Sequence, residues 1–491
     1  TGTSEAFAPV NLFGKATAGQ TAVEGSYKIT LPGTYYFWLT ADVASAAVEN
    51  AVAAVSLASV TGNGTETTLA GTVSASTTVA AGKSGTYTVG AGADFGTIQA
   101  AVNSLKDGID GPVVINIKRG IYNENVEIPE IPGASATNTI TIQSESGDWH
   151  DVQIYHNNYN EPTYSDDKMF AEYGVFTVAG ADWVTLRGLD LTTTDLNYPG
   201  VLHVKNESRH LTVDGCHIHT GISTSYSTDI NLIYTYSRNV AYQNNDYMTV
   251  KNCLLEGGYI GVRMGGTGHV ALPKEVGGVI ENNIIRNQGT KAIYCMDELG
   301  AKIRGNRIEN DQTTKEFYGF DGQLRDEYSE SFEIVGNKFN FNLSSSCDPI
   351  SMREMKGTAE APVIVANNEI VVCSDNSGSF GIKLGSASQN VNIAYNTVNI
   401  NGNAKSAAMY VNDKNLENVN ILNNIFMNRA GGYAYCYNKA EYVALPKYAH
   451  NVAYTTGSVF AYDKTDIASY DDWKAISKET DGQNVAVEFF D

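Results

Sequence analysis

The chain of 491 residues is poor in methionine and proline, with 8 Met and 11 Pro, and it has no long apolar run. No stretch approaches the roughly 18 consecutive apolar residues that a membrane-spanning helix requires, so we expect no membrane span. Basic residues are also few: 33 Lys and Arg stand against 54 Asp and Glu, for a formal net charge of -21. Because no basic run interrupts this acidity, the composition excludes nucleic acid as an expected partner.

Cysteine is scarce, and none of the six residues forms a CxxC pair. They are Cys216, Cys253, Cys295, Cys347, Cys373 and Cys436. An even count is compatible with three disulfides. Two of them, Cys216 and Cys253, occupy the same position of a repeat described below, where a small buried residue is needed. We expect free thiols there, with a disulfide between them as the less favoured alternative.

Glycine and tyrosine are abundant, with 47 Gly and 29 Tyr, which is typical of a turn-rich, all-β protein. The chain begins with Thr-Gly rather than Met, so we expect that a leader has been removed. This predicts a protein of the extracellular space, the periplasm or the cell surface. We expect a monomer.

Residues 1–82 differ from the rest and predict a small β-sandwich domain. They are rich in Ala, Thr, Val and Gly, and the run 35–40 (YYFWLT) is typical of a buried strand after the Pro32-Gly33 turn. The runs NLFG (11–14) and GTYYFWLTADV (33–43) resemble the accessory β-sandwich at the N-terminus of some bacterial BNR-repeat sialidases. The resemblance implies a secreted, glycan-related context and no catalysis.

Residues 83–491 form the second predicted domain, which opens with an amphipathic helix. Phe95, Ile98, Val102 and Leu105 recur on one helical face within residues 94–105. Short alternating strands follow directly. A helix in this place would cover the open end of a hydrophobic strand stack, which would otherwise contact water.

An eight-residue repeat carries the strongest signal of architecture. Its copies are VTLRGLDL (184–191), LTVDGCHI (211–218), MTVKNCLL (248–255), GVIENNII (278–285), AKIRGNRI (301–308), FEIVGNKF (332–339), VIVANNEI (363–370), VNIAYNTV (391–398) and VNILNNIF (419–426), with a degenerate copy around Asn451.

The sixth position of this repeat is mostly asparagine. It reads Leu189, Cys216, Cys253, Asn283, Asn306, Asn337, Asn368, Asn396, Asn424 and Asn451. Stacked at one parallel-strand step of about 4.8 Å, these amides would bond to one another and to buried turn backbone. The pattern predicts an all-β fold: a right-handed, single-stranded parallel β-helix of about ten or more coils with an N-terminal capping helix.

This array resembles the pectin lyase-like superfamily of parallel β-helices. The segment 87–128, which includes GADFGTIQAAV (92–102) and IKRGIYNENV (117–126), is similar to the opening of pectin methylesterases. The catalytic aspartate motif and the downstream arginine motif of those esterases are absent, so methylesterase activity is not implied. The calcium-binding signature of pectate lyases is absent too. Calcium is therefore suggested by family analogy alone, and we expect no metal site and no other cofactor.

A second strand precedes each repeat, and alternation along it predicts an outward-facing file of polar and aromatic side chains. The members are His203, Tyr234, Arg263, Tyr294, Asp321, either Ser351 or Arg353, Lys383 and Tyr410. Tyrosine rings can lie against sugar faces, and Arg and Lys can pair with uronate carboxylates. A solvated sheet face with tyrosines placed for strand propensity is the alternative.

Long excursions at 236–247, 265–277 and 322–331 are expected to rise beside the middle of this file and to concentrate function there. We predict catalytic roles for Asp321, Glu298, Asp297, Tyr294 and Arg263. We predict substrate contacts for His203, Tyr234, Arg325, Arg353, Lys383 and Tyr410. A hydrolase would use two carboxylates about 5–9.5 Å apart. A lyase acting on a uronate would use a base and a neutralising cation.

Three histidines, His203, His217 and His219, are expected to lie near one another. His217 and His219 share one face of a strand. Zinc needs three or four ligands, and no third ligand is evident, so a structural role is favoured.

Two hypotheses of function follow. In the first, the chain is a lyase or glycoside hydrolase acting on an acidic polysaccharide in a groove along the β-helix. In the second, it is a non-catalytic glycan-binding or surface protein, with the helix as a rigid scaffold. The missing family motifs favour the second hypothesis. The crowding of loops and mixed charges favours the first.

Overall fold

The computed structural model describes a large part of the chain. The described residues are 52–62, 65–78, 82–157, 174–196, 200–224, 230–235, 244–265, 274–312, 315–325, 329, 331–374, 378–385, 387–412, 416–437 and 446–489. The chain divides into two compact units, residues 1–82 and 83–491. In the first unit, β1 (Val52–Gly62) and β2 (Thr65–Thr78) form an antiparallel pair. The predicted β-sandwich rests largely on residues 1–51, which lie outside the described residues, so it stays a prediction.

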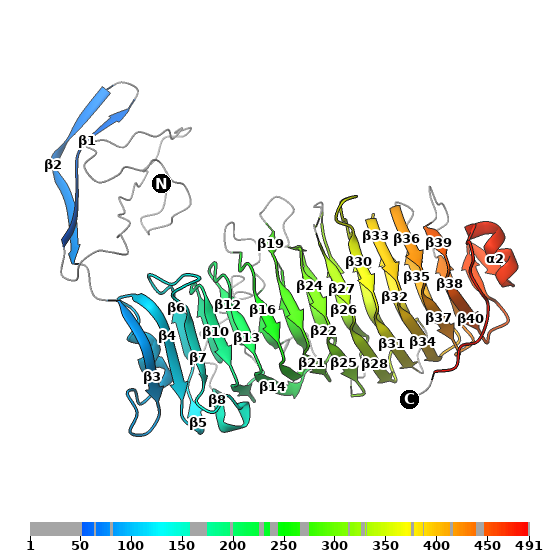
Figure 1. The fold of residues 1–491 in the computed structure, drawn as a ribbon, viewed down its shortest axis with the longest axis horizontal. Helices are drawn as coiled ribbons and strands as arrows, with labels where there is room; N and C mark the ends of the chain where they lie inside the picture. The colour runs from blue at the N-terminus through cyan, green and yellow to red at the C-terminus, as the bar shows by residue number, and fades with distance from the viewer. Residues whose placement is uncertain are drawn as a thin grey trace. The chain divides into compact units, whose positions relative to one another are not determined.

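The second unit consists of three long sheets of stacked strands, which are parallel except for the antiparallel pair β41–β42 at the end of sheet 3 (Figure 1). Sheet 1 contains β3 (Lys83–Val89), β4 (Ile109–Ile117), β7 (Ile140–Ser144), β10 (Val184–Arg187), β13 (Thr212–Asp214), β16 (Thr249–Lys251), β20 (Val279–Glu281), β24 (Lys302–Arg304), β27 (Glu333–Val335), β30 (Val363–Ala366), β33 (Gln389–Ala394), β36 (Glu417–Leu422) and β39 (Lys447–Ala449).

Sheet 2 contains β5 (Gly120–Asn123), β8 (Val152–Tyr155), β11 (Asp190–Thr193), β14 (His217–Ile222), β17 (Leu254–Gly258), β21 (Ile284–Arg286), β25 (Arg307–Asn310), β28 (Lys338–Leu343), β31 (Glu369–Ser374), β34 (Thr397–Gly402), β37 (Ile425–Asn428) and β40 (Val452–Thr455). A single-turn 3-10 helix, η1 (Trp149–Asp151), precedes β8.

Sheet 3 contains β6 (Val126–Pro129), β9 (Phe176–Ala179), β12 (Gly200–Lys205), β15 (Asn231–Tyr234), β18 (Ile260–Met264), β22 (Lys291–Met296), β26 (Phe317–Gln323), β29 (Cys347–Arg353), β32 (Phe380–Gly385), β35 (Ala407–Asn412), β38 (Tyr433–Tyr437), β41 (Ala461–Asp463) and β42 (Thr465–Ile467). A short extra pair joins β19 (Glu275–Val276) to β23 (Glu298–Leu299).

Each coil contributes one strand to each sheet, so identical positions of successive coils lie above one another. In sheet 1 the inward position is branched and apolar from β4 to β36, with Tyr448 in the last strand, and its members are buried. They include Val250, Ile280, Ile303, Ile334, Val365, Ile393 and Ile421. β-Branched side chains suit this stack because they pack well on a pleated surface. The predicted all-β parallel β-helix is confirmed.

The corner between sheets 1 and 2 requires left-handed backbone at the fifth position of every repeat. The φ angles there lie between +55° and +69°. The residues are Gly188, Gly215, Asn252, Asn282, Gly305, Gly336, Asn367, Tyr395, Asn423 and His450. Glycine and asparagine dominate because they adopt this conformation at low cost. The frequent Gly and Asn at the fifth position of the repeat are therefore explained by the backbone conformation of this turn.

The predicted asparagine ladder is confirmed and runs without a break from Asn283 to Asn451. From Asn306 onward, the side-chain oxygen at each rung accepts hydrogen bonds from the backbone N–H and the side-chain amide of the asparagine one coil earlier, at 2.9–3.1 Å. The same amide donates to a sheet 1 carbonyl, as from Asn337 to Ile303 at 2.9 Å. Buried turn backbone is thereby satisfied along the whole stack.

Helices close both ends of the stack. At the first end, α1 (Ile98–Asn103) buries Ile98 and Val102, as the predicted capping helix should, and Glu124 accepts the backbone N–H of Ile98 at 3.1 Å. At the other end, α2 (Tyr470–Ser477) follows the last coil, and its buried Trp473 stacks on Tyr435 with ring centroids 4.9 Å apart (Figure 1). Both helices keep water from the core.

All six cysteines are free thiols, in agreement with the expectation for Cys216 and Cys253, which are buried at the first rungs of the ladder column. Within the described part of the chain, no helix has the length and apolar character needed to cross a bilayer.

Candidate functional site

The outward face of sheet 3 carries the predicted file of polar and aromatic side chains. Parallel register places its members at equivalent positions of successive strands, in the order His203, Tyr234, Arg263, Tyr294, Asp321, Ser351, Lys383 and Tyr410. Ser351, and not Arg353, is the member from β29. Arg353 lies two residues further along and pairs with Gln323 of the neighbouring strand.

A second outward file runs beside the first because these strands bend. Two adjacent residues point inward, such as Ala292 and Ile293, so outward side chains lie on both sides of the bend. The bend position is small in β18, β22 and β26, where it is Gly261, Ala292 and Gly319, and a Cβ on Gly319 would lie 2.6 Å from a backbone oxygen of the next strand. The second file contains Lys291, Tyr318, Asp348 and Phe380. Sequence alternation alone did not reveal it.

The centre of this face is an ionic cluster around Asp321. Lys291 forms an ion pair with one carboxylate oxygen of Asp321, and Arg353 lies 3.3 Å from the other. The ammonium of Lys291 also lies 4.0 Å from the ring centroid of Tyr294. Burial lowers the pKa of Lys291, an effect that Asp321 opposes and that Arg353 and Arg263 reinforce. The guanidinium of Arg263 lies within 5.6 Å of two tyrosine rings, those of Tyr234 and Tyr294.

A second ion pair lies further along the same face. The ammonium of Lys383 contacts the carboxylate of buried Asp348 at 2.8 Å. Burial raises the pKa of Asp348 to about 6, although Lys383 acts in the opposite direction. Next to this pair, the rings of Phe380 and Tyr410 stack with centroids 4.0 Å apart.

Three predicted substrate contacts are largely covered. His203, Tyr234 and Tyr410 are each buried, and His203 packs on Tyr234 with ring centroids 5.1 Å apart. Burial lowers the pKa of His203 to about 3, so its imidazole is neutral at physiological pH. Their predicted contact with substrate stays a prediction. The more open members are Arg263, Tyr294, Lys291 and Arg353.

Asp297 and Glu298 do not lie on this open face. The chain leaves sheet 3 at Asp297, and both residues are buried, with 0% and 1% of their surface exposed. The carboxylate of Asp297 is 2.6 Å from the guanidinium of Arg325 and 3.3 Å from the ammonium of Lys274. Arg325 is thus engaged in a buried ion pair as well. These positions follow from the turn at the strand end, which carries its side chains inward.

Glu298 has a different environment from Asp297. It lies beside Glu275 in the β19–β23 pair, and the backbone N–H of Gly278 donates to it at 2.7 Å. Burial and the neighbouring Glu275 raise the pKa of Glu298 well above its usual range. Burial raises the pKa of Glu275 to about 8. The catalytic roles predicted for Asp297 and Glu298 stay predictions, and most of the excursions 236–247, 265–277 and 322–331 lies outside the described residues.

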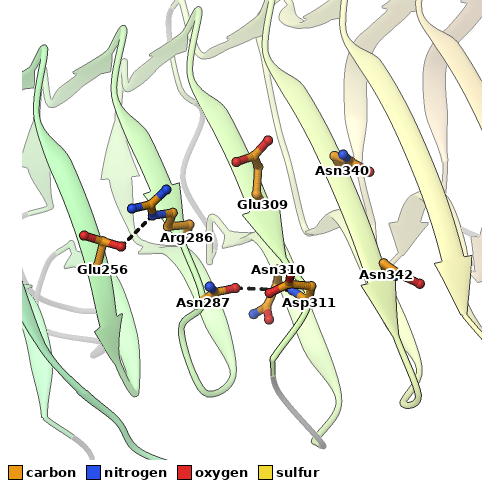
Figure 2. A pocket seen from close by; sticks show the side chains of 8 residues that line it. All are labelled: Glu256, Arg286, Asn287, Glu309, Asn310, Asp311, Asn340 and Asn342. Carbon is orange, nitrogen blue, oxygen red and sulfur yellow. Dashed lines mark hydrogen bonds and ion pairs between the residues drawn. The ribbon is translucent and has the colours of Figure 1, made fainter.

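Sheet 2 carries a groove on its outward face that the sequence did not reveal (Figure 2). Its volume is about 500 Å³, and Glu256, Arg286, Glu309 and Asn340 occupy equivalent positions of four successive strands along it. The remaining lining residues are Asn287, Asn310, Asp311 and Asn342. An ion pair of 2.5 Å links Glu256 to Arg286. The lining contains no aromatic ring.

One coil before this groove, sheet 2 gathers two histidines and an aspartate. Asp190 of β11 lies opposite His217 of β14, and His219 follows on the same face. One carboxylate oxygen of Asp190 is 3.1 Å from Nδ1 of His217 and 3.0 Å from Nε2 of His219. Burial alone would raise the pKa of Asp190, but contacts with both histidines and Gln153 outweigh it and hold that pKa well below its usual range.

The histidine prediction is therefore corrected in two respects. His203 lies on β12 of sheet 3, whereas His217 and His219 lie on sheet 2, so the three do not form one group. Asp190 is the third group, which the sequence interpretation missed. The repeat contained the signal, because Asp190 and His217 both occupy its seventh position, in VTLRGLDL and LTVDGCHI.

No family model and no curated protein matches this chain. Similar solved structures include the surface adhesin PfbA of Streptococcus pneumoniae, at 15% identity over 70% of this chain and 95% of that chain, with a TM-score of 0.43. A GH136 lacto-N-biosidase from Eubacterium ramulus shows 12% identity over 82% of this chain and 68% of that chain, with a TM-score of 0.48. Pectin methylesterase from carrot shows 12% identity over 66% of this chain and 87% of that chain, with a TM-score of 0.38.

These likenesses concern stacked β-coils, and no activity passes from them to this chain. The coils, the capping helix and the asparagine ladder confirm that the chain from Lys83 onward folds as a parallel β-helix.

Proposed function

We propose that this chain is a secreted or cell-surface protein that binds an acidic, uronate-containing polysaccharide on the outward face of sheet 3. The single observation that supports this most is the cationic group around Asp321, formed by Lys291, Arg353 and Arg263. The chain as a whole carries a formal charge of -21, so a local excess of cations on one face selects for an anionic ligand.

Aromatic rings complete the binding face. Tyr294 and Tyr318 flank Lys291, with ring centroids 4.0 and 5.1 Å from its ammonium. Such rings offer apolar faces to the C–H side of a sugar while the cations hold its carboxylate. The strand spacing of about 4.8 Å repeats these elements along the helix axis, as an extended polymer requires.

The chemistry that this set of side chains favours is β-elimination. Arg353 and Arg263 neutralise the uronate carboxylate, which acidifies the neighbouring C5–H. A lowered pKa increases the fraction of molecules in which Lys291 is neutral, and in that form its amine accepts the proton. The C5–H electron pair then forms the C4–C5 double bond, the C4–O glycosidic bond breaks, and the leaving O4 takes up the proton from the Lys291 ammonium, so no water is consumed. Hydrolysis is less favoured because, among the described residues, the other carboxylates predicted for it, Asp297 and Glu298, are buried.

Binding and cleavage are tested separately with polygalacturonate and its carboxyl-reduced, neutral counterpart. Arg263→Ala should weaken binding of the anionic polymer at least tenfold and leave the neutral polymer unaffected, as measured by calorimetry. Lys338→Ala is the matched control, because it removes an exposed cation from sheet 2, where Lys338 pairs with Glu369 at 3.0 Å. Equal affinity of both polymers for the wild-type chain would refute the proposed ligand class.

Cleavage is followed by the ultraviolet absorbance of the unsaturated product. Lys291→Met should abolish the absorbance change while binding persists. A wild-type chain that binds acidic polymers, including alginate, but produces no absorbance change would support the scaffold hypothesis over the lyase. An increase in reducing ends without ultraviolet absorbance would indicate a hydrolase instead.

A further inference from the structure

We infer that Asp190, His217 and His219 form a zinc-binding site on the outward face of sheet 2, next to the groove of Figure 2. This site is independent of the glycan face on sheet 3. One ligand atom from each residue lies within 4.8 Å of the others. Two imidazoles and a carboxylate are the ligands that zinc takes in sites with an open fourth position.

The size of the group fits the ion. Tetrahedral zinc with bonds of about 2.0–2.1 Å separates neighbouring ligand atoms by roughly 3.3 Å. The carboxylate oxygen of Asp190 lies 3.1 Å from Nδ1 of His217 and 3.0 Å from Nε2 of His219. The third separation, between Nδ1 of His217 and Nε2 of His219, is within 4.8 Å, so zinc binding would require side-chain shifts that bring these two nitrogens to about 3.3 Å from one another.

Hydrogen bonding supplies a second, independent observation. Oδ1 of Asp190 and Nδ1 of His217 are buried atoms without a hydrogen-bond partner, although they face one another. Their residues are only 7% and 9% exposed. Buried polar atoms are nearly always satisfied, so two unsatisfied atoms that converge on one point indicate a missing partner.

The other nitrogen of His217 explains why that partner is a cation. Nε2 lies 3.0 Å from a carboxylate oxygen of Glu256, a contact that requires the proton on Nε2. In the neutral imidazole, Nδ1 then presents a lone pair to the anionic oxygen of Asp190. Two lone pairs at 3.1 Å repel, and a metal ion between them removes the conflict. A histidine with one nitrogen on the metal and the other on a carboxylate is a common arrangement at zinc sites.

The surrounding contacts hold the ligands in place. The second oxygen of Asp190 accepts a hydrogen bond from Gln153 at 2.8 Å, and Arg286 fixes Glu256. The two imidazoles stack with ring centroids 4.2 Å apart, and the ring centroids of Trp149 and His217 lie 4.4 Å apart. His219 is half-buried, so water can reach the fourth coordination position from its side.

The test uses the full chain after treatment with a chelator. Calorimetry with zinc alone should show one site per chain, and cobalt substituted for zinc should give the visible absorbance of a tetrahedral N/O site. Asp190→Asn and His219→Ala should each weaken zinc binding at least a hundredfold and remove the cobalt spectrum. His219 lies at the rim, so its variant tests the site even if the Asp190 variant fails to fold.

His450→Ala is the matched control, because His450 lies 3.9 Å from the carboxylate of Asp481 and, among the described residues, no third metal-ligating side chain joins this pair. It should bind zinc as the wild type does. The inference is overturned if the wild type binds no zinc, or if His219→Ala binds zinc as tightly as His450→Ala. The first outcome would indicate that a protonated His217 bridges Asp190 and Glu256.

Discussion

Sheets 2 and 3 come from the same coils and share one core, yet they present different chemistry to solvent. Sheet 3 shows cations and aromatic rings, with Arg263, Lys291 and Tyr294 at its centre. Sheet 2 shows imidazoles, carboxylates and amides, beginning at the Asp190 group and continuing through Glu256 into the groove. The comparison shows that an inner stack of branched apolar residues and amides fixes the backbone, which leaves each outward file free to acquire its own ligand.

The largest effect is expected from a change in the interior that sheets 2 and 3 share. Destabilised coils would lose both outward faces at once. Asn337→Ala removes the acceptor for the backbone N–H and amide of Asn306 and the donor to Ile303. Each buried group left unsatisfied costs about 1–3 kcal/mol, so for these three groups we expect a loss of roughly 3–9 kcal/mol. Chemical denaturation should show a lower midpoint, and zinc and glycan binding should fail together.

Asn340→Ala is the control for that change. Asn340 lies on β28 three residues further along and faces outward into the groove. Its replacement should leave the denaturation midpoint within about 0.5 kcal/mol of the wild type, as surface substitutions usually do. If Asn337→Ala were equally harmless, the ladder would not be what stabilises the coils from which both sheets are built.

A smaller effect is expected from a substitution on sheet 2 that weakens zinc binding and leaves glycan binding on sheet 3 unchanged. Glu256→Ala removes the carboxylate that orients His217 and should weaken zinc binding about tenfold, because such outer partners typically contribute 10–100-fold. Glu309→Ala serves as the comparison, since Glu309 lies in the same file of the groove and pairs with Arg307. Zinc titration should distinguish the two variants. Neither should alter polygalacturonate binding, and a change there would mean that the faces are coupled.

The smallest effect concerns pH on sheet 3. Asp348, with a pKa raised to about 6, loses its proton as pH increases through that value. The new negative charge pairs with Lys383 and repels an anionic glycan, so wild-type affinity should fall between pH 5 and pH 7. One partly screened charge is worth about 0.4–1 kcal/mol, or roughly two- to fivefold.

Asp348→Asn should bind with nearly the same affinity at both pH values and more tightly than the wild type at pH 7. Zinc binding to sheet 2 should show the opposite trend and weaken as pH falls, because metal ligands must be deprotonated. Parallel titrations at pH 5 and 7 test both statements. If Asp348→Asn and the wild type showed the same dependence of glycan affinity on pH, Asp348 would not contribute to glycan binding.

Much of this molecule follows from the repeat alone. Period, apolar positions and the asparagine column predicted the coils and the ladder, because each of these is dictated by contacts with the coil directly above or below. The capping helix followed from a separate signal, the apolar face formed by residues such as Ile98 and Val102. The outward file from His203 to Tyr410 followed from the same register. Alternation failed at the strand bend, since two adjacent inward residues such as Ala292 and Ile293 break the two-residue period.

The sequence by itself thus determined the stack, because a parallel β-helix repeats one local rule. Only the tertiary structure decided which outward residues meet. It separated His203 from the other histidines, placed Asp190 beside His217 and buried Asp297 at a strand end. Those outcomes depend on the direction in which each turn leaves its sheet, and a repeat pattern specifies the position of a residue along a coil without specifying that direction.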